Sequence, residues 1–298
     1  MNRLKYFHMT QEVKKEKFFN DRMIRVIVGG CIFYTIIATL YYGSWLLTIF
    51  MLLLWWQINT EYIHIVKYTG VNLPTFWIRF VSLLFLITCS LPNLGFSKDL
   101  PLKLFIFIFL LGVTGCCFRL IFRGKDENHI AKISDIGASV LGFIYTGIFP
   151  SFLILVQQID YVYAIITCFS ISMCDVGAYY GGKFFGKHKL RPEISPKKTI
   201  EGSISGLIFS IITAYVLFIP SKTYFLDNPM YAIGLGLICG IFSQFGDLFE
   251  SLLKRDAGVK DSSHLLLSHG GVLDRIDGYM FVLWAVYFYV KWVILLEF

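Results

Sequence analysis

The sequence predicts an all-α, polytopic membrane protein with about nine transmembrane helices and a cytoplasmic N-terminus. The 298 residues are 56% hydrophobic and only 16% charged, against roughly 25% charged residues in an average soluble domain. One globular core of this size cannot hide so much apolar surface, so lipid must cover much of it. Long apolar runs recur along the chain, and basic residues gather in alternate gaps between them.

Nine apolar runs are long enough to cross about 30 Å of hydrocarbon. The predicted helices are 24–43, 44–60, 76–95, 101–121, 136–157, 161–182, 202–220, 230–251 and 279–297. The chain then divides into a basic cytoplasmic segment (1–23), N-terminal transmembrane helices (24–135) and a transmembrane region that holds the candidate chemical groups (136–298). No small-residue cleavage site follows the first apolar run, so we do not expect a cleaved signal peptide.

The distribution of basic residues supports this topology. With the N-terminus inside, the cytoplasmic segments are 1–23, 61–75, 122–135, 183–201 and 252–278, and all but five of the 27 Lys and Arg fall in or beside them. This is the positive-inside bias of membrane proteins. It argues against a nucleic-acid partner, because the charge lies between apolar runs rather than on a soluble face. The seven cysteines lie in apolar runs without metal-ligand spacing, which predicts buried, inert thiols.

The first unusual cytoplasmic segment spans 175–202 and begins with an acid inside an apolar run. An ionised Asp175 is costly there without a cation, so it is either a functional acid or half of a structural pair with a lysine. Gly177 and Gly181 follow, and glycines at these positions either admit a ligand to the backbone or allow helices to pack closely.

The same segment ends in Ser195-Pro196-Lys197-Lys198-Thr199, just before a helix that opens with Glu201-Gly202. Free N–H groups at a helix N-terminus, with lysines beside them, form a natural phosphate site. The alternative is a solvated loop that touches anionic lipid. Ser195, Lys197 and Lys198 are therefore candidate phosphate contacts.

The second unusual segment spans 243–277. Asp247 and Glu250 lie about one turn apart on a predicted helix, and Asp274 and Asp277 have the i,i+3 spacing of one helix face. Between these acids lie further polar candidates, namely Lys254, Arg255, Lys260, Asp261, His269, Gly270, Gly271 and Arg275. Hard oxygen ligands among phosphate-binding cations are what magnesium–polyphosphate chemistry requires. No Ser/His/Asp or Cys/His arrangement is visible, so covalent catalysis by the protein is not expected.

Residues 251–277 resemble the signature of the phosphatidate cytidylyltransferases, also called CDP-diacylglycerol synthases. The pattern is S-x-[apolar]-K-R, four residues, K-D, then H-G-G-[apolar]-x-D-R-[apolar]-D, and it is matched by Ser251, Lys254, Arg255, Lys260, Asp261, Ser263, His269, Gly270, Gly271, Asp274, Arg275 and Asp277. The departures are Leu267 and Ser268, where the family usually has Pro-Gly. Upstream, Asp175-Val176-Gly177-Ala178-Tyr179 is similar to the family's D-[ST]-G-A-Y, with Val176 in place of the hydroxyl residue.

The resemblance implies a reaction in which CTP and phosphatidate give CDP-diacylglycerol and pyrophosphate, for phospholipid biosynthesis. It implies Mg²⁺ on Asp247, Asp274 and Asp277, with a second, monovalent cation such as K⁺ nearby. We expect these acids, Lys260 and Arg275 to be catalytic. The expected substrate-binding residues are Asp175 and Asp261 on the nucleotide side, Ser195, Lys197 and Lys198 at the triphosphate, Lys254 and Arg255 at the lipid phosphate, and His269, Gly270 and Gly271 at a phosphate.

Both segments fall on the predicted cytoplasmic side, where CTP is available and a lipid phosphate can enter laterally. The expected location is the inner (cell) membrane of a bacterium, with CTP, phosphatidate and membrane lipid as partners and a homodimer as the assembly. Two alternatives remain at this point. One is another CTP-dependent membrane enzyme, such as a CDP-archaeol synthase or a polyprenol or phytol kinase. The other is a cation-coupled transporter, which the absence of an internal repeat disfavours.

Overall fold

The computed structural model describes residues 30, 34–122, 132–263, 265 and 270–296. Residues 34–42 are helical. The longer helices that follow are α2 (Ser44–Lys67), α3 (Thr75–Ser90), α4 (Leu100–Phe122), α5 (Ile133–Phe143), α6 (Phe149–Ile159), α7 (Tyr161–Phe185), α8 (Ile200–Phe218), α9 (Pro229–Asp256) and α10 (Leu273–Tyr289). Short helical pieces are η1 (Leu91–Leu94), η2 (Ile144–Ile148), η3 (Ile219–Phe225) and η5 (Val290–Ile294), and a small sheet consists of β1 (Lys189–Arg191) and β2 (Ser195–Thr199).

The all-α polytopic class is confirmed. In the described part of the chain, seven helices are long and apolar enough to cross a membrane. Eight of the nine predicted runs overlie described helices, with η2 joining α5 to α6 in one continuous rod. Most of the predicted run 24–43 lies outside the described residues, so the count of nine stays a prediction.

Two helix boundaries were predicted wrongly. We expected the second helix to end at residue 60, where the apolar run ends, but α2 continues to Lys67 and includes Glu61. We expected the last helix to begin at residue 279, but α10 begins at Leu273. The apolar run alone set the predicted boundary, whereas acids are favoured in the first turn of a helix by its macrodipole. Asp274 and Asp277 therefore lie in the first turns of α10 rather than in a preceding loop.

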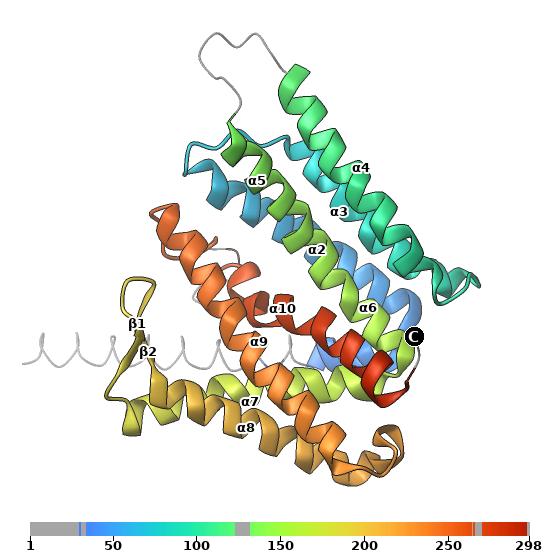
Figure 1. The fold of residues 1–298 in the computed structure, drawn as a ribbon, viewed down its shortest axis with the longest axis vertical. Helices are drawn as coiled ribbons and strands as arrows, with labels where there is room; N and C mark the ends of the chain where they lie inside the picture. The colour runs from blue at the N-terminus through green and yellow to red at the C-terminus, as the bar shows by residue number, and fades with distance from the viewer. Residues whose placement is uncertain (1–29, 31–33, 123–131, 264, 266–269, 297–298) are drawn as a thin grey trace, which may run out of the picture.

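The connections between helices collect at two ends of the molecule. At one end the backbone N–H of Asn72 donates to Asp135 Oδ1 at 3.0 Å, joining the loop after α2 to the start of α5. At the other end Lys291 Nζ lies 2.8 Å from Asp99 Oδ1, and this bond and the lysine's charge hold the pKa of the exposed Asp99 below its usual value. Figure 1 shows the first end at the left and top, and the C-terminus at the right. Successive loops lie at alternate ends of the molecule, as the topology predicted from the positive-inside bias requires. The cytoplasmic assignment of the first end stays a prediction.

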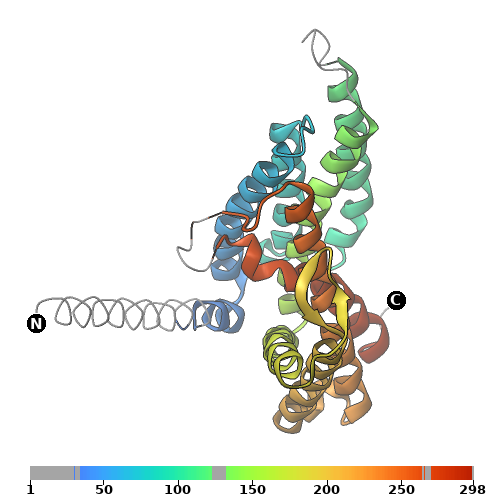
Figure 2. The same cartoon turned by 90° about the vertical axis from the view of Figure 1, so that its left-hand side faces the viewer.

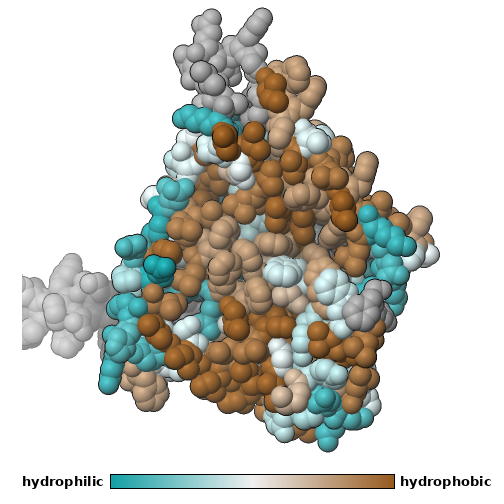
Figure 3. All heavy atoms as spheres, viewed as in Figure 1, coloured by the Kyte–Doolittle hydropathy of each residue, from teal (hydrophilic) through white to brown (hydrophobic). Residues whose placement is uncertain are grey.

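An apolar surface lies between these two ends. Figure 3 shows apolar side chains across the middle of one face, with hydrophilic side chains at its left and right margins. On α4, large side chains such as Ile106, Phe107 and Leu110 are more than half exposed. Exposure of this kind over whole helices needs lipid around it. The chain is an integral membrane protein.

Glycines set the closest helix pair, α7 and α8. Gly177 and Gly181 on α7 face Ser205 and Phe209 on α8, and each helix has a glycine pair with the spacing of a GxxxG motif, Gly202 and Gly206 being the pair on α8. A Cβ on Gly206 would lie 2.8 Å from the carbonyl oxygen of Cys174, and one on Gly202 would lie 2.7 Å from that of Ala178. Small residues let membrane helices approach to backbone contact. Of the two interpretations open for Gly177 and Gly181, the structure shows helix packing.

The loop between α7 and α8 folds into the β1–β2 hairpin, which the sequence did not predict. Its strands are antiparallel, with Lys189 opposite Thr199 and Arg191 opposite Ser195. Glu201, in the first turn of α8, accepts hydrogen bonds from the backbone of Lys187 at 3.0 Å and from His188 Nδ1 at 2.6 Å. The hairpin is thereby fixed over the start of α8 (Figure 2).

Candidate functional site

A polar pocket opens where the hairpin meets α7, α8 and α9. Its volume is about 410 Å³. Its walls comprise Asp175, Ala178, Tyr179, Gly182, Lys183, Leu190, Lys197, Lys198, Thr199, Gly202, Ser203, Gln244 and Asp247. The structure thus joins the two unusual segments of the sequence in one site, since the lining residues come from both 175–202 and 243–277.

An ion pair links the two segments inside this pocket. Lys198 Nζ, on β2, lies 2.6 Å from Asp247 Oδ2, on α9. The lysine side chain is about a quarter exposed and the aspartate side chain 38% exposed. The Asp247 carboxylate is therefore accessible to a cation, whereas the Lys198 Nζ is itself buried and would have to turn from Asp247 to contact a polyphosphate.

Two further carboxylates lie near this ion pair. Asp247 interacts electrostatically with both Asp175, on α7, and Asp277, on α10. Gly246 brings the last two helices together, because a Cβ there would overlap the carbonyl oxygen of Asp277. A side chain at position 246 would push α10 away, so this glycine places Asp247 beside Asp277.

Asp274 faces a different set of neighbours. Its Oδ1 lies 2.7 Å from Lys254 Nζ, and Lys254 also pairs with the fully buried Glu250 one turn earlier on α9. The other oxygen accepts from Ser262 Oγ at 2.9 Å and from the backbone N–H of Gly271 at 2.8 Å. The side chain of Asp274 is only 7% exposed. In the described structure it joins α9 and the segment around Ser262 to the start of α10.

Glu61, on α2, holds the same region from the other side. It is 1% exposed, and its carboxylate accepts from Ser263 Oγ at 2.6 Å, from Val272 N at 3.0 Å and from Leu273 N at 2.7 Å. Ser262 Oγ lies 3.0 Å from it as well, between Glu61 and Asp274, and its one hydrogen can be donated to either carboxylate but not to both. The N-terminal turn of α10 is thus capped by a side chain about 200 positions earlier in the chain.

The paired glycines before α10 have a packing role here. Gly270 has φ of +78°, a left-handed conformation that glycine adopts without strain. A Cβ on Gly270 would lie 2.6 Å from Asp274 Oδ2, and one on Gly271 would lie 2.6 Å from Glu61 Oε2. The backbone around this pair therefore contacts the protein's own carboxylates. Their predicted contact with substrate stays a prediction.

The remaining predicted site residues are divided between the pocket and its margin. Lys197 lines the pocket, and Ser195 begins β2. Arg255 Nε donates to the carbonyl of Ile194 at 3.3 Å, which ties the end of α9 to the hairpin. The other members are exposed at the same end of the molecule: Lys260, Asp261 and Arg275, of which Arg275 also acts electrostatically on Asp175. His269 lies outside the described residues.

The carboxylates suit a hard cation by kind and by number. Among the described residues, no three His, Cys, Asp or Glu form a group arranged to hold a metal ion. Magnesium in phosphate chemistry is bound through one or two carboxylates, with waters and substrate phosphates as its other ligands. Asp247 and Asp277 would meet that need, with Asp175 close by, whereas Asp274, the third predicted ligand, is bonded to Lys254, Ser262 and Gly271 in this structure. Binding of Mg²⁺ or K⁺ stays a prediction.

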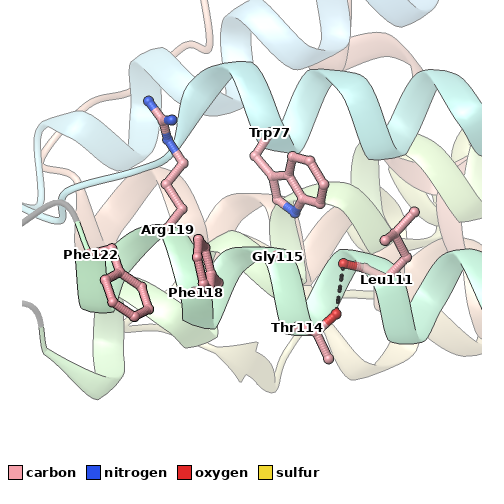
Figure 4. Close-up of a pocket in the computed structure, with 7 residues that line it drawn as sticks. All are labelled: Trp77, Leu111, Thr114, Gly115, Phe118, Arg119 and Phe122. Atoms are coloured by element: carbon pink, nitrogen blue, oxygen red, sulfur yellow. Dashed lines mark hydrogen bonds between the residues drawn. The ribbon is translucent and has the colours of Figure 1, made fainter.

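A larger hollow elsewhere does not carry this chemistry. It lies between α3 and α4 and has a volume of about 620 Å³. Figure 4 shows its lining, in which Trp77 lies over Gly115 and Arg119 points away from the Phe118 and Phe122 rings. None of the described residues that line it is a carboxylate, and its exposed aromatic side chains are those of a lipid-facing surface. Charge, rather than volume, distinguishes the candidate site.

Three residues that take part in the site or its support were not predicted from the sequence. Glu61 falls in the predicted cytoplasmic segment 61–75, far from the signature, and no local pattern distinguished it from an exposed loop acid, whereas the structure places it on α2. Gln244 and Ser203 meet across the pocket, and Gln244 Nε2 donates to the carbonyl of Ser203 at 3.0 Å. A glutamine one turn before Asp247 on the same helix face was the available signal.

Together the fold and the pocket define a polytopic membrane protein with a cation-and-carboxylate site at one end of its helices. The chain matches the profile of the Cytidylyltransferase family over residues 23–293. It is 31% identical to a phosphatidate cytidylyltransferase of Synechocystis sp. over 304 aligned positions, which cover 91% of this chain and 96% of that protein. Proteins of the same name from Bacillus subtilis and Staphylococcus aureus are 39% and 42% identical, over 52% and 50% of this chain and 58% and 56% of theirs. The chain belongs to the cytidylyltransferase family.

Proposed function

We propose that this protein transfers the cytidylyl group of CTP to phosphatidate, giving CDP-diacylglycerol and pyrophosphate. The observation that carries the proposal is the Lys198–Asp247 ion pair, at 2.6 Å, inside the polar pocket of a chain that belongs to this family. The pair places a phosphate-binding cation against a hard oxygen ligand. It does so at the end of the helix bundle, where a lipid headgroup would lie.

The proposed reaction is a single displacement at phosphorus. An oxygen of the lipid phosphate forms a bond to the α-phosphorus of CTP. The bond from that phosphorus to the bridging oxygen breaks, and its electron pair leaves with pyrophosphate. No proton need be removed from the attacking phosphate, which is already anionic near neutral pH. The protein's task is therefore to position the reactants and to balance charge.

Lysines and carboxylates divide that task. Lys197 and Lys198 line the pocket and would contact the triphosphate of CTP. Negative charge accumulates on the pyrophosphate as it leaves, and the lysines would stabilise that charge. Asp247 and Asp277 would hold Mg²⁺, which when bound neutralises phosphate oxygens. Lys254 already pairs with Asp274 and Glu250, so a direct contact with the lipid phosphate would require it to leave one of them.

The pocket borders the lipid-facing surface of α7. Tyr179 lines it and is 65% exposed, and the next turn presents Phe184, 68% exposed. Aromatic side chains of this kind are common at headgroup depth. A lipid phosphate could reach the pocket there without leaving the bilayer, and we place this end on the cytoplasmic side of a bacterial inner membrane. The homodimer stays a prediction.

The decisive assay is incorporation of radiolabelled CTP into lipid by the purified protein. We expect incorporation only with phosphatidate and Mg²⁺ present, and pyrophosphate rather than CDP as the second product. Asp247→Asn should remove nearly all activity while the protein still inserts. Release of CDP, or preference for an isoprenoid acceptor, would refute the proposal in favour of another CTP-dependent lipid enzyme.

A further inference from the structure

We propose that Glu61 is a positioning residue for cytidylyl transfer, acting by fixing the first turn of α10 and so the placement of Asp274 and Asp277. This inference rests on the proposed function of the pocket. Glu61 belongs to α2, outside both charged segments, and it does not line the pocket. Its influence on the reaction must therefore pass through the residues to which it is bonded.

The carboxylate of Glu61 is completely engaged. Its five hydrogen-bonding neighbours are Gln57 Nε2 at 2.8 Å, Ser262 Oγ at 3.0 Å, Ser263 Oγ at 2.6 Å, Val272 N at 3.0 Å and Leu273 N at 2.7 Å, and of these Ser262 has one hydrogen to give to either Glu61 or Asp274. Four of the five belong to the signature segment or to the start of α10. A carboxylate offers about four lone-pair sites on two oxygens, and no neutral side chain of this size accepts as many bonds. Glutamine would replace one acceptor by a donor and oppose an N–H group.

The start of α10 depends on this remote carboxylate because it has no local cap. Val272, the residue before the helix, makes no side-chain capping bond. Glu61 accepts the N–H groups of Val272 and Leu273, and Asp274 accepts that of Gly271. A negative charge at a helix N-terminus is also favoured by the macrodipole. Two carboxylates thus determine where α10 begins.

Where α10 begins determines where its acids point. Asp277 follows Asp274 by one turn, and its backbone oxygen contacts α9 at Gly246, next to Asp247. If the first turn of α10 loosens or shifts, Asp277 moves relative to Asp247. The walls that would contact the nucleotide come from α7, β2, α8 and α9. Loss of Glu61 should therefore lower turnover more than it weakens CTP binding.

Asn59 provides a matched control, because it is another buried polar side chain on α2. It is 0% exposed and accepts from Ser82 Oγ at 3.2 Å and Thr146 Oγ1 at 3.1 Å. These partners lie on α3 and η2, and neither hydrogen bond involves the start of α10. Asn59→Ala should cost stability as any buried polar truncation does, without releasing the first turn of α10.

The test compares Glu61→Gln with Asn59→Ala in two measurements on the full-length protein. For kcat per folded molecule we expect a loss of about 30-fold or more in Glu61→Gln, with KM for CTP within about twofold, because misplacement by about 1 Å can cost two orders of magnitude in rate. Asn59→Ala should keep kcat within about threefold. Adding Ser263→Ala to Glu61→Gln should cause little further loss, since the two side chains act as one unit.

Amide hydrogen exchange is the second measurement and does not depend on activity. Peptides that contain Val272 and Leu273 should exchange at least about tenfold faster in Glu61→Gln and at the wild-type rate in Asn59→Ala. Unchanged exchange in Glu61→Gln would overturn the inference even if activity fell. Faster exchange with unchanged kcat would overturn the positioning role. A wild-type protein that transfers no cytidylyl group would instead refute the proposed function, while exchange would still report whether Glu61 holds α10.

Discussion

Gly246 offers a sharp test of how the site is assembled, because the backbone of α10 lies directly against it. A Cβ there would overlap the carbonyl oxygen of Asp277 and lie 3.2 Å from its carbonyl carbon. Backbone atoms cannot rotate away as a flexible side chain can. Since ordinary contact begins at 3.4 Å, α9 and α10 would have to separate by about 1 Å in Gly246→Ala. A displacement of that size at a reacting centre can cost about 100-fold in rate.

The expected result is a fall in kcat of about 100-fold, with the protein still inserted and folded. The assay is incorporation of radiolabelled CTP, normalised to folded protein and accompanied by a thermal melt. Gly236→Ala is the control, because its Cβ would lie 2.7 Å from Ile211 Cα, on the α8 side of the same helix. That change should lower the melting temperature comparably and leave turnover largely intact. Equal kcat losses in the two variants would refute the claim that Gly246 places Asp247 beside Asp277.

Three further predictions follow from the contacts of the pocket and its margin. Lys198→Met should raise KM for CTP about tenfold or more through loss of a charge-assisted phosphate contact, whereas the exposed Lys187→Met should not; equal KM values would remove Lys198 from the nucleotide site. Lys254→Met should destabilise the protein by about 3 kcal/mol in a melt, because Glu250 and Asp274 lose the cation they share, with Lys222→Met as the exposed control. Addition of Mg²⁺ to protein stripped with EDTA should raise the melting temperature in the wild type and not in Asp247→Asn, and an equal rise in both would contradict the metal assignment.

Hydrophobic runs were sufficient to predict most of the fold. The helices from α2 to α9 follow directly from apolar length, because backbone groups in lipid must be satisfied within a helix. Asp175, Lys198 and Asp247 were also predictable as a group, since each is a charge at the margin of an apolar run. The structure brings these three side chains together in one pocket, and their role as one reactive site stays a prediction.

The parts that could not be predicted are those fixed by long-range hydrogen bonds. The β1–β2 hairpin depends on Glu201, whose bonds to His188 and Lys187 have no pattern in sequence. The start of α10 depends on Glu61, and hydrophobicity alone placed it six residues too late. Local propensity carries no information about a partner 200 positions away.

The contacts of Glu61 and Gly246 explain why the N-terminal helices belong to the functional unit even though they do not line the pocket. The acids of α10 are placed by two constraints at once, a carboxylate from α2 above the first turn and a glycine of α9 beside the second. Helices α9, α6 and α7 also pack against α10, but these two contacts lie at the turns that carry its acids. A fragment holding only residues 136–298 would keep the pocket's residues and lose the contact of Glu61 with the start of α10. Such a fragment should bind nucleotide better than it turns it over.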